Sequence, residues 1–291
     1  MFYCITNLPD VKEISVQCGA CTALTTYDNT PIQGYVSWAA SEDAAEGMNL
    51  VIENYNKGVQ VTWQVYTPEE IEADPALGMV QLFYFPAKTE NAKYVVVVPG
   101  NGGNTTAELN EGASIANQLH DLGYAVFVLR YRSFLNASDN ALLYDIANAV
   151  KYLGLIGSDN ERFGYKAFGI PQPAALLLGY PINDFYEVKP LYHIAIDPLI
   201  IGWRYYWTNI SDVVNKNYTP TFFWYGKNDY YMECMNYEKQ GPLLEKTLKE
   251  SGATYQCVVY EDAPHAIGPG RHTDADGWIK LAAEFWEEQC K

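Results

Sequence analysis

The apolar residues of the chain follow two different patterns. In residues 59–66 and, more loosely, in residues 79–86, apolar and polar side chains alternate with a period of two, as they do in half-exposed strands. From residue 94 onward the apolar residues form continuous runs separated by helical segments, which is typical of a parallel sheet covered on both faces. We therefore predict an antiparallel pair of strands at one sheet edge, followed by a parallel sheet.

The continuous runs define the predicted elements of the main domain. They indicate strands at residues 94–98, 125–131, 174–180, 221–225 and 255–260, and helices at 108–122, 141–153, 237–250 and 276–289. This alternation predicts an α/β protein with a doubly wound, mostly parallel sheet and helices on both faces. Residues 1–58 show no repeat, and we predict that they form an N-terminal extension of helical turns packed on a domain of residues 59–291.

Composition narrows the class of partner. The 291 residues are 48% hydrophobic and carry a formal charge of -16, which allows a large core and works against binding to nucleic acid or to an anionic membrane surface. No apolar run approaches the roughly 20 residues of a membrane-spanning helix, and the first residues lack the pattern of a signal peptide. We therefore expect a cytoplasmic protein that acts on a small molecule; the oligomeric state does not follow from the sequence.

The cysteines do not predict a cofactor. Six cysteines in a chain of this length are typical of free thiols rather than of a disulfide framework. Cys18 and Cys21 have the spacing of half a zinc site or of a redox dithiol, but no second pair accompanies them. We expect neither a metal nor another cofactor.

Two residues with acid–base chemistry follow the last two predicted strands. Asp229 comes shortly after the strand at 221–225, and His265 shortly after the strand at 255–260. Because ligands bind beyond the carboxyl ends of parallel strands, we expect these side chains to lie at one catalytic edge, with His265 as general base and Asp229 as the carboxylate that orients it. The alternative, that His265 is an ordinary loop residue, stays open.

Several segments resemble the esterase/lipase branch of the α/β-hydrolase superfamily, in particular the acetyl-xylan-esterase-like carbohydrate esterases. The matching segments lie within about residues 60–290 and include 97–103, 111–112, 123–132, 173–181, 220–229 and 265–268. The resemblance implies an esterase or deacetylase that acts on small acylated or acetylated carbohydrates. It also implies that Asp229 and His265 are the triad acid and base, and that Gly102 and Gly103 lie near the oxyanion hole. Asn101 departs from the all-glycine run of the family, and a plain glycine-rich turn is the alternative.

The nucleophile of that family is missing. No G-x-S-x-G occurs in the chain, and the 20 positions from residue 154 to 173 are fewer than the roughly 25 that a strand, an elbow and a helix need. We therefore expect the central nucleophile strand to be absent, through a natural loss or through a deletion in the gene, and we predict that the strand at 174–180 takes its place. Ser158 is the nearest hydroxyl, but Ser-Asp-Asn is more typical of a turn or a helix cap.

Three functional hypotheses follow. The first is an ester hydrolase that is inactive or impaired because its nucleophile is lost. The second is a non-catalytic binding or scaffold protein, and the third is an active hydrolase with an unrecognised nucleophile such as Ser158.

An aromatic segment, two arginines and a threonine also attract attention in the sequence. An aromatic segment could form a substrate lid or a packed loop; its residues are Trp203, Tyr205, Tyr206 and Trp207. Arg130 and Arg132 could contact a carboxylate substrate, although a structural ion pair is the preferred interpretation. Thr273 is predicted to cap the last helix.

Overall fold

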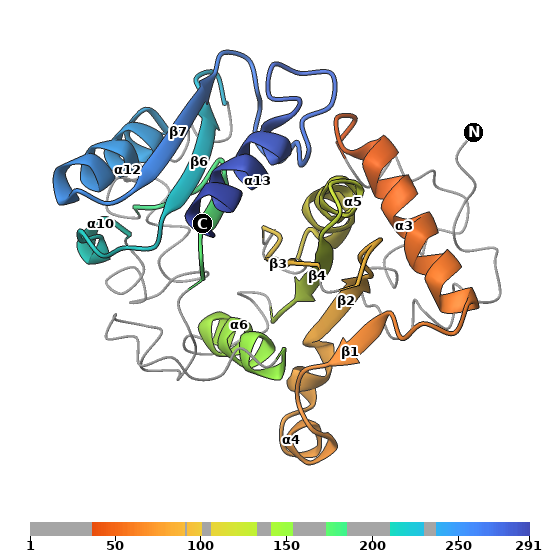
Figure 1. Ribbon diagram of the computed structural model, residues 1–291. Helices are drawn as coiled ribbons and strands as arrows, with labels where there is room; N and C mark the ends of the chain where they lie inside the picture. The colour runs from red at the N-terminus through yellow and green to blue at the C-terminus, as the bar shows by residue number, and fades with distance from the viewer. Residues whose placement is uncertain are drawn as a thin grey trace. The chain divides into compact units, whose positions relative to one another are not determined.

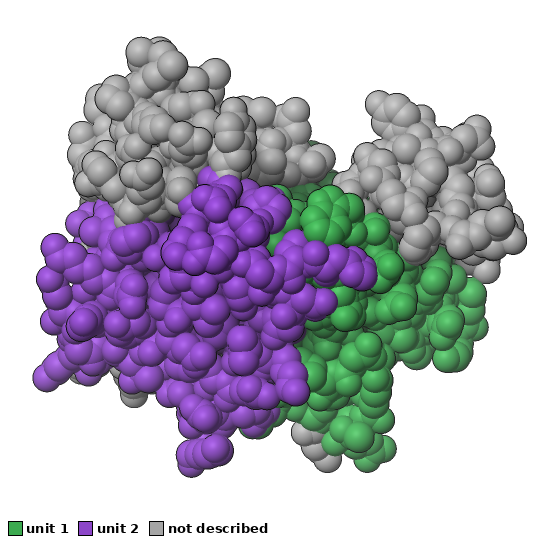
Figure 2. Space-filling model, turned by 90° about the horizontal axis from the view of Figure 1, so that it is seen from above, with its two compact units in different colours: residues 1–152, 266–271 green, residues 153–265, 272–291 purple. Residues whose placement is uncertain are grey.

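The computed structural model describes residues 37–90, 92–100, 106–132, 141–153, 173–184, 210–229 and 237–291 (Figure 1). The chain divides into two compact units, which Figure 2 distinguishes by colour. Unit 1 comprises residues 1–152 and 266–271, and unit 2 comprises residues 153–265 and 272–291. Each unit has its own sheet.

The sheet of unit 1 has the strand order β1-β2-β4-β3. Its strands are β1 (Thr62–Gln64), β2 (Gln81–Phe85), β3 (Tyr94–Val97) and β4 (Ala125–Arg130). β2 is antiparallel to both β1 and β4, whereas β3 is parallel to β4. The predicted antiparallel pair at residues 59–66 and 79–86 is therefore confirmed.

Helices pack on this sheet with close backbone approaches. The helical elements of unit 1 are α3 (Ser41–Asn56), α4 (Pro68–Ala73), η3 (Pro75–Met79), η4 (Glu108–Ala113), α5 (Ser114–Asp121) and α6 (Ala141–Tyr152). The predicted helix at 108–122 consists of a π-helical turn, η4, that continues into α5. A Cβ at Gly47 would lie 2.5 Å from the carbonyl oxygen of Ala113, so α3 contacts η4 through a position that only glycine fits.

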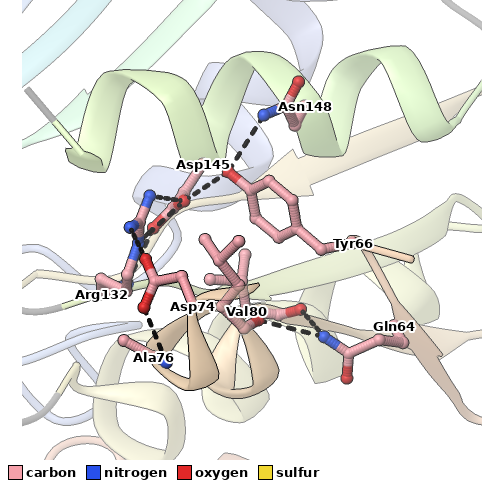
Figure 3. Close-up of polar contacts among 9 residues, drawn as sticks. Gln64, Tyr66, Asp74, Ala76, Val80, Arg132, Asp145 and Asn148 are labelled. Atoms are coloured by element: carbon pink, nitrogen blue, oxygen red, sulfur yellow. Dashed lines mark hydrogen bonds and ion pairs between the residues drawn. The ribbon is translucent and has the colours of Figure 1, made fainter. Parts of the chain in front are cut away.

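A buried carboxylate links α6 to the rest of unit 1 (Figure 3). Asp145 is fully buried and accepts hydrogen bonds from the Tyr66 hydroxyl at 2.7 Å and from Nη2 of Arg132 at 2.7 Å. The hydrogen bond with Asp145 is the main cause that raises the pKa of the Arg132 guanidinium, and burial raises the pKa of Tyr66 to about 12. Both groups therefore keep their protons while they hold the carboxylate.

The short segment 266–271 joins unit 1 from far along the chain. Arg271 forms an ion pair with the buried Asp43 of α3 at 2.8 Å, and its backbone N–H donates to the carbonyl of Ala39. The amide of Asn110 donates to the Ala266 carbonyl at 2.5 Å. The segment is thus bound to α3 at one end and to η4 at the other.

The sheet of unit 2 is parallel and has the order β5-β6-β7. Its elements are β5 (Leu176–Gly179), α10 (Ile210–Val213), β6 (Thr221–Gly226), α12 (Tyr237–Ser251), β7 (Tyr255–Tyr260) and α13 (Trp278–Gln289). Phe222 contacts Phe285 of α13, whereas the next residue, Phe223, packs in a cluster with Leu244 and Leu248 of α12. Successive residues of β6 thus bury opposite faces, and Figure 1 shows the two helices on either side of the strand.

The predicted α/β class is confirmed, but the start of the last helix differs from the prediction. β5 pairs with β6, and the replacement of the central strand by the strand at 174–180 stays a prediction. The last helix begins at Trp278 after a left-handed Gly277, because Thr273 accepts a hydrogen bond from the N–H of Ala275 and forms a turn instead of a cap.

The domain boundary and the central strand lie beyond what the described residues test. The boundary between residues 58 and 59 stays a prediction, as does the absence of the central strand, because residues 154–172 lie outside the described part. In the described part, no helix combines the length and the apolarity that crossing a membrane requires.

We expect Asp145→Asn to lower the free energy of unfolding by about 3–5 kcal/mol, because it removes the charge that neutralises a largely buried arginine. Urea denaturation checks this. Asp121→Asn is the control, since it breaks an exposed ion pair with Lys88 and should cost about 1 kcal/mol or less. Equal losses in the two variants would contradict the structural role of Asp145.

Candidate active site

Asp229 and His265 lie together in unit 2. Oδ2 of Asp229 is 3.0 Å from Nδ1 of His265. Asp229 is 1% exposed, whereas the His265 side chain is 19% exposed. Because an ionised carboxylate only accepts hydrogen bonds, Nδ1 of His265 is the donor in this pair. The two residues that the sequence predicts as a pair are therefore in hydrogen-bond contact, and their catalytic roles stay a prediction.

The loops after β6 and β7 are joined by hydrogen bonds that fix this geometry. The N–H of Lys227 donates to the Tyr260 carbonyl at 2.8 Å, and the Asn228 amide donates to the Glu261 carbonyl at 2.9 Å. The carboxylate of Asp274 accepts from the N–H of Glu261 at 2.6 Å. These bonds hold the segment before Asp229 against the segment before His265.

Gly226 makes the close approach of the two loops possible. A Cβ at this position would overlap the carbonyl oxygen of Ala263. Because the contact is with backbone and not with the end of a flexible side chain, a side chain at residue 226 would push the loops apart.

Tyr180 contacts the imidazole of His265, although the sequence predicts it only as the last residue of a strand. Its ring centroid lies 4.7 Å from that of His265 and 4.8 Å from that of Trp224. Its backbone has φ 38°, in the left-handed region. Nothing in the local sequence signals this conformation, since glycine and asparagine are the residues that favour it.

The glycine-rich turn after β3 belongs to unit 1, and its predicted oxyanion residues, Gly102 and Gly103, lie outside the described residues. The described residues before and after them are anchored. The N–H of Gly100 donates to the buried Glu111 at 2.7 Å, and the Tyr131 hydroxyl donates to the Pro99 carbonyl at 2.6 Å. A Cβ at Gly100 would overlap the Glu111 carboxylate, so a larger residue there would require that side chain to shift.

The two arginines that follow this region pair with carboxylates of the protein. Arg130 lies 3.5 Å from Glu108, and Arg132 bonds to Asp145. Burial is the main cause that raises the pKa of Glu108, while its hydrogen bond with Thr106 and the charge of Arg130 oppose the shift. The preferred interpretation of both arginines as structural ion pairs is confirmed.

Other candidates lie elsewhere or outside the described part. Ser158 and the four predicted lid residues, Trp203, Tyr205, Tyr206 and Trp207, are not among the described residues. Within the described residues, no cluster of three or more His, Cys, Asp or Glu is arranged to hold a metal ion. Cys257 on β7 is not a substitute nucleophile, because burial raises the pKa of its thiol to about 12.

The fold matches solved structures of ester hydrolases. An acetyl ester-xyloside bifunctional hydrolase from Caldicellulosiruptor lactoaceticus superposes with a TM-score of 0.63 at 17% identity, over 78% of this chain and 95% of that chain. A truncated carbohydrate esterase from gut microbiota gives 0.57 at 15% identity, over 80% and 97% of the two chains. A carboxylesterase from Lactobacillus plantarum gives 0.57 at 16% identity, over 72% and 93%.

These similarities show the fold, which is that of the α/β-hydrolase esterases. No family model matches the chain, and no curated protein matches it.

Gly226→Ala should destabilise the protein by about 1–3 kcal/mol, because the added methyl group overlaps backbone. Thermal unfolding measures the effect. Gly78→Ala is the control, since its Cβ would meet Ile71 at an ordinary 3.4 Å. A Gly226→Ala variant as stable as the control would show that the loops tolerate separation.

Alkylation of the folded protein by iodoacetamide at pH 8 should modify Cys290, which is exposed, at least about a hundredfold faster than Cys257. With a pKa near 12, the Cys257 thiolate is rare at pH 8, and its modification rate should rise about tenfold per pH unit until the pH reaches that value. Peptide-resolved mass spectrometry measures both rates. A Cys257 rate that does not rise with pH would contradict the raised pKa.

Proposed function

We propose that this protein is an ester hydrolase that acts on small acylated or acetylated carbohydrates, and that its turnover is impaired because it lacks a serine nucleophile elbow. The observation that carries the proposal is the hydrogen bond between Asp229 and His265, 3.0 Å long, on the loops after two neighbouring parallel strands. A buried carboxylate behind a partly exposed imidazole is the arrangement of a general base.

The substrate class rests on similar structures. The names of two of them refer to an acetyl ester-xyloside hydrolase and to a carbohydrate esterase. Because one fold serves many reactions, these names support the substrate class and not a particular acyl group or alcohol.

The reaction needs an attacking oxygen, which in this proposal belongs to water. Nε2 of His265 takes a proton from the water molecule while the water oxygen bonds to the acyl carbon. The carbon–oxygen bond to the alcohol then breaks, and His265 returns the proton to the leaving alkoxide. Asp229 accepts the Nδ1–H bond throughout, so the positive charge that forms on the imidazole is stabilised by the carboxylate.

The absence of G-x-S-x-G limits the rate. In serine hydrolases the loss of the nucleophile lowers kcat by about 10⁶. A base without a nucleophile should therefore give slow turnover.

The folded protein should hydrolyse p-nitrophenyl acetate faster than buffer by no more than about 10⁴-fold, which is the contribution expected of a general base. His265→Ala should abolish the excess rate, whereas Ser158→Ala should leave it unchanged. Thermal unfolding of the same samples shows whether each variant is folded.

Two results would contradict the proposal. No excess rate in a folded protein would favour the hypothesis of a non-catalytic binding protein. A fast rate that both Ser158→Ala and His265→Ala abolish would identify a serine nucleophile, which labelling with a covalent serine probe would then locate.

A further inference from the structure

We propose that Tyr180 is a positioning residue that holds the imidazole of His265 in the orientation required of the base. This inference rests on the proposed function for its catalytic meaning, but its geometry stands on contacts within unit 2. Tyr180 lies at the carboxyl end of β5, the strand that pairs with β6. The same strand order places its backbone beside the strand that leads to Asp229.

The backbone of Tyr180 is strained. Its φ of 38° is unusual for a bulky residue, because the Cβ of a residue in the left-handed region crowds the backbone. Such strain persists where the surroundings over-determine the conformation, and strained residues cluster at functional sites. Here the N–H of Tyr180 donates to the carbonyl of Trp224 at 2.8 Å, which continues the β5–β6 ladder past the point where the strand turns.

The ring of Tyr180 fills the space between an indole and the imidazole. It packs edge-on against Trp224 with an interplanar angle of 88°, and it lies tilted at 57° to His265. Gly179 brings the indole close to the strand end, because a Cβ there would be 3.2 Å from Nε1 of Trp224. Trp224 is fully buried and Tyr180 is 8% exposed, so the tyrosine ring has little freedom to move.

This contact supplies what the Asp229 hydrogen bond lacks. The bond at Nδ1 fixes the distance between imidazole and carboxylate, whereas the orientation of the ring plane also depends on what packs against its face. A second ring packed against the imidazole restricts that orientation and therefore the direction in which Nε2 points. The residue that follows His265 in the sequence, Ala266, has a left-handed backbone like that of Tyr180, with φ 57°.

The test compares three variants by two measurements. Tyr180→Leu keeps apolar bulk without the ring, and Tyr180→Phe keeps the ring without the hydroxyl. Tyr260→Leu is the matched control, since Tyr260 also packs against Trp224, at 5.3 Å, from β7. The measurements are the downfield proton resonance of the hydrogen bond at Nδ1 of His265, assigned by its absence in His265→Ala, and the rate at which diethyl pyrocarbonate modifies His265.

We expect Tyr180→Leu to broaden or remove the resonance and to speed modification of His265 by about two- to tenfold, the factor that corresponds to loss of one aromatic pair. Tyr180→Phe and Tyr260→Leu should behave like the unchanged protein. His120 and His272 are internal references, and their rates should not change. A purely structural effect of Tyr180→Leu would raise all the histidine rates together.

Several results would overturn the inference. They are an unchanged resonance and rate in Tyr180→Leu, an equal change in Tyr260→Leu, and loss of the signature in Tyr180→Phe. If Tyr180→Leu does not fold, nuclear Overhauser contacts between the two rings in the unchanged protein decide the matter, and their absence overturns it. Because neither measurement uses ester turnover, failure of the proposed function leaves this result distinguishable.

Discussion

A carboxylate leaves water only where a cation or several donors replace its hydration, and this constraint shapes both units of the protein. Cations are scarce, because the chain has 35 acidic and 19 basic side chains. Asp43, Asp145 and Glu108 are nevertheless buried, and each lies against an arginine. Asp229 is buried as well, but it meets a histidine. An arginine keeps its proton at any physiological pH, so the first three carboxylates have a permanent cation beside them, whereas Asp229 has an imidazole.

The periodicity of the chain was enough to predict the class of the fold and most of its elements. The order of Asp229 and His265 was also informative, because the carboxyl ends of neighbouring parallel strands meet at one edge. Features that depend on contacts distant in sequence were not predictable. The left-handed Tyr180 depends on the ladder with Trp224, and the binding of Arg271 to Asp43 joins residues 228 positions apart. Local patterns contain no information on either.

Each of the two sheets ends in a parallel strand. In the described part of the chain these terminal strands include β3 in unit 1 and β5 in unit 2. The fold and the Asp229–His265 contact are both present, although the G-x-S-x-G motif is not.

The segment 266–271 has a consequence for biosynthesis. Asp43 and Arg271 are separated by 228 positions, and at about 5–20 residues per second the ribosome needs roughly ten to fifty seconds to deliver the arginine after the aspartate. Through that interval the nascent chain carries an acidic group that cannot yet be neutralised in place. During this interval the amides of Asn117 and Gln118 are the donors that Asp43 can meet, and its arginine partner joins them only after residue 271 has been synthesised.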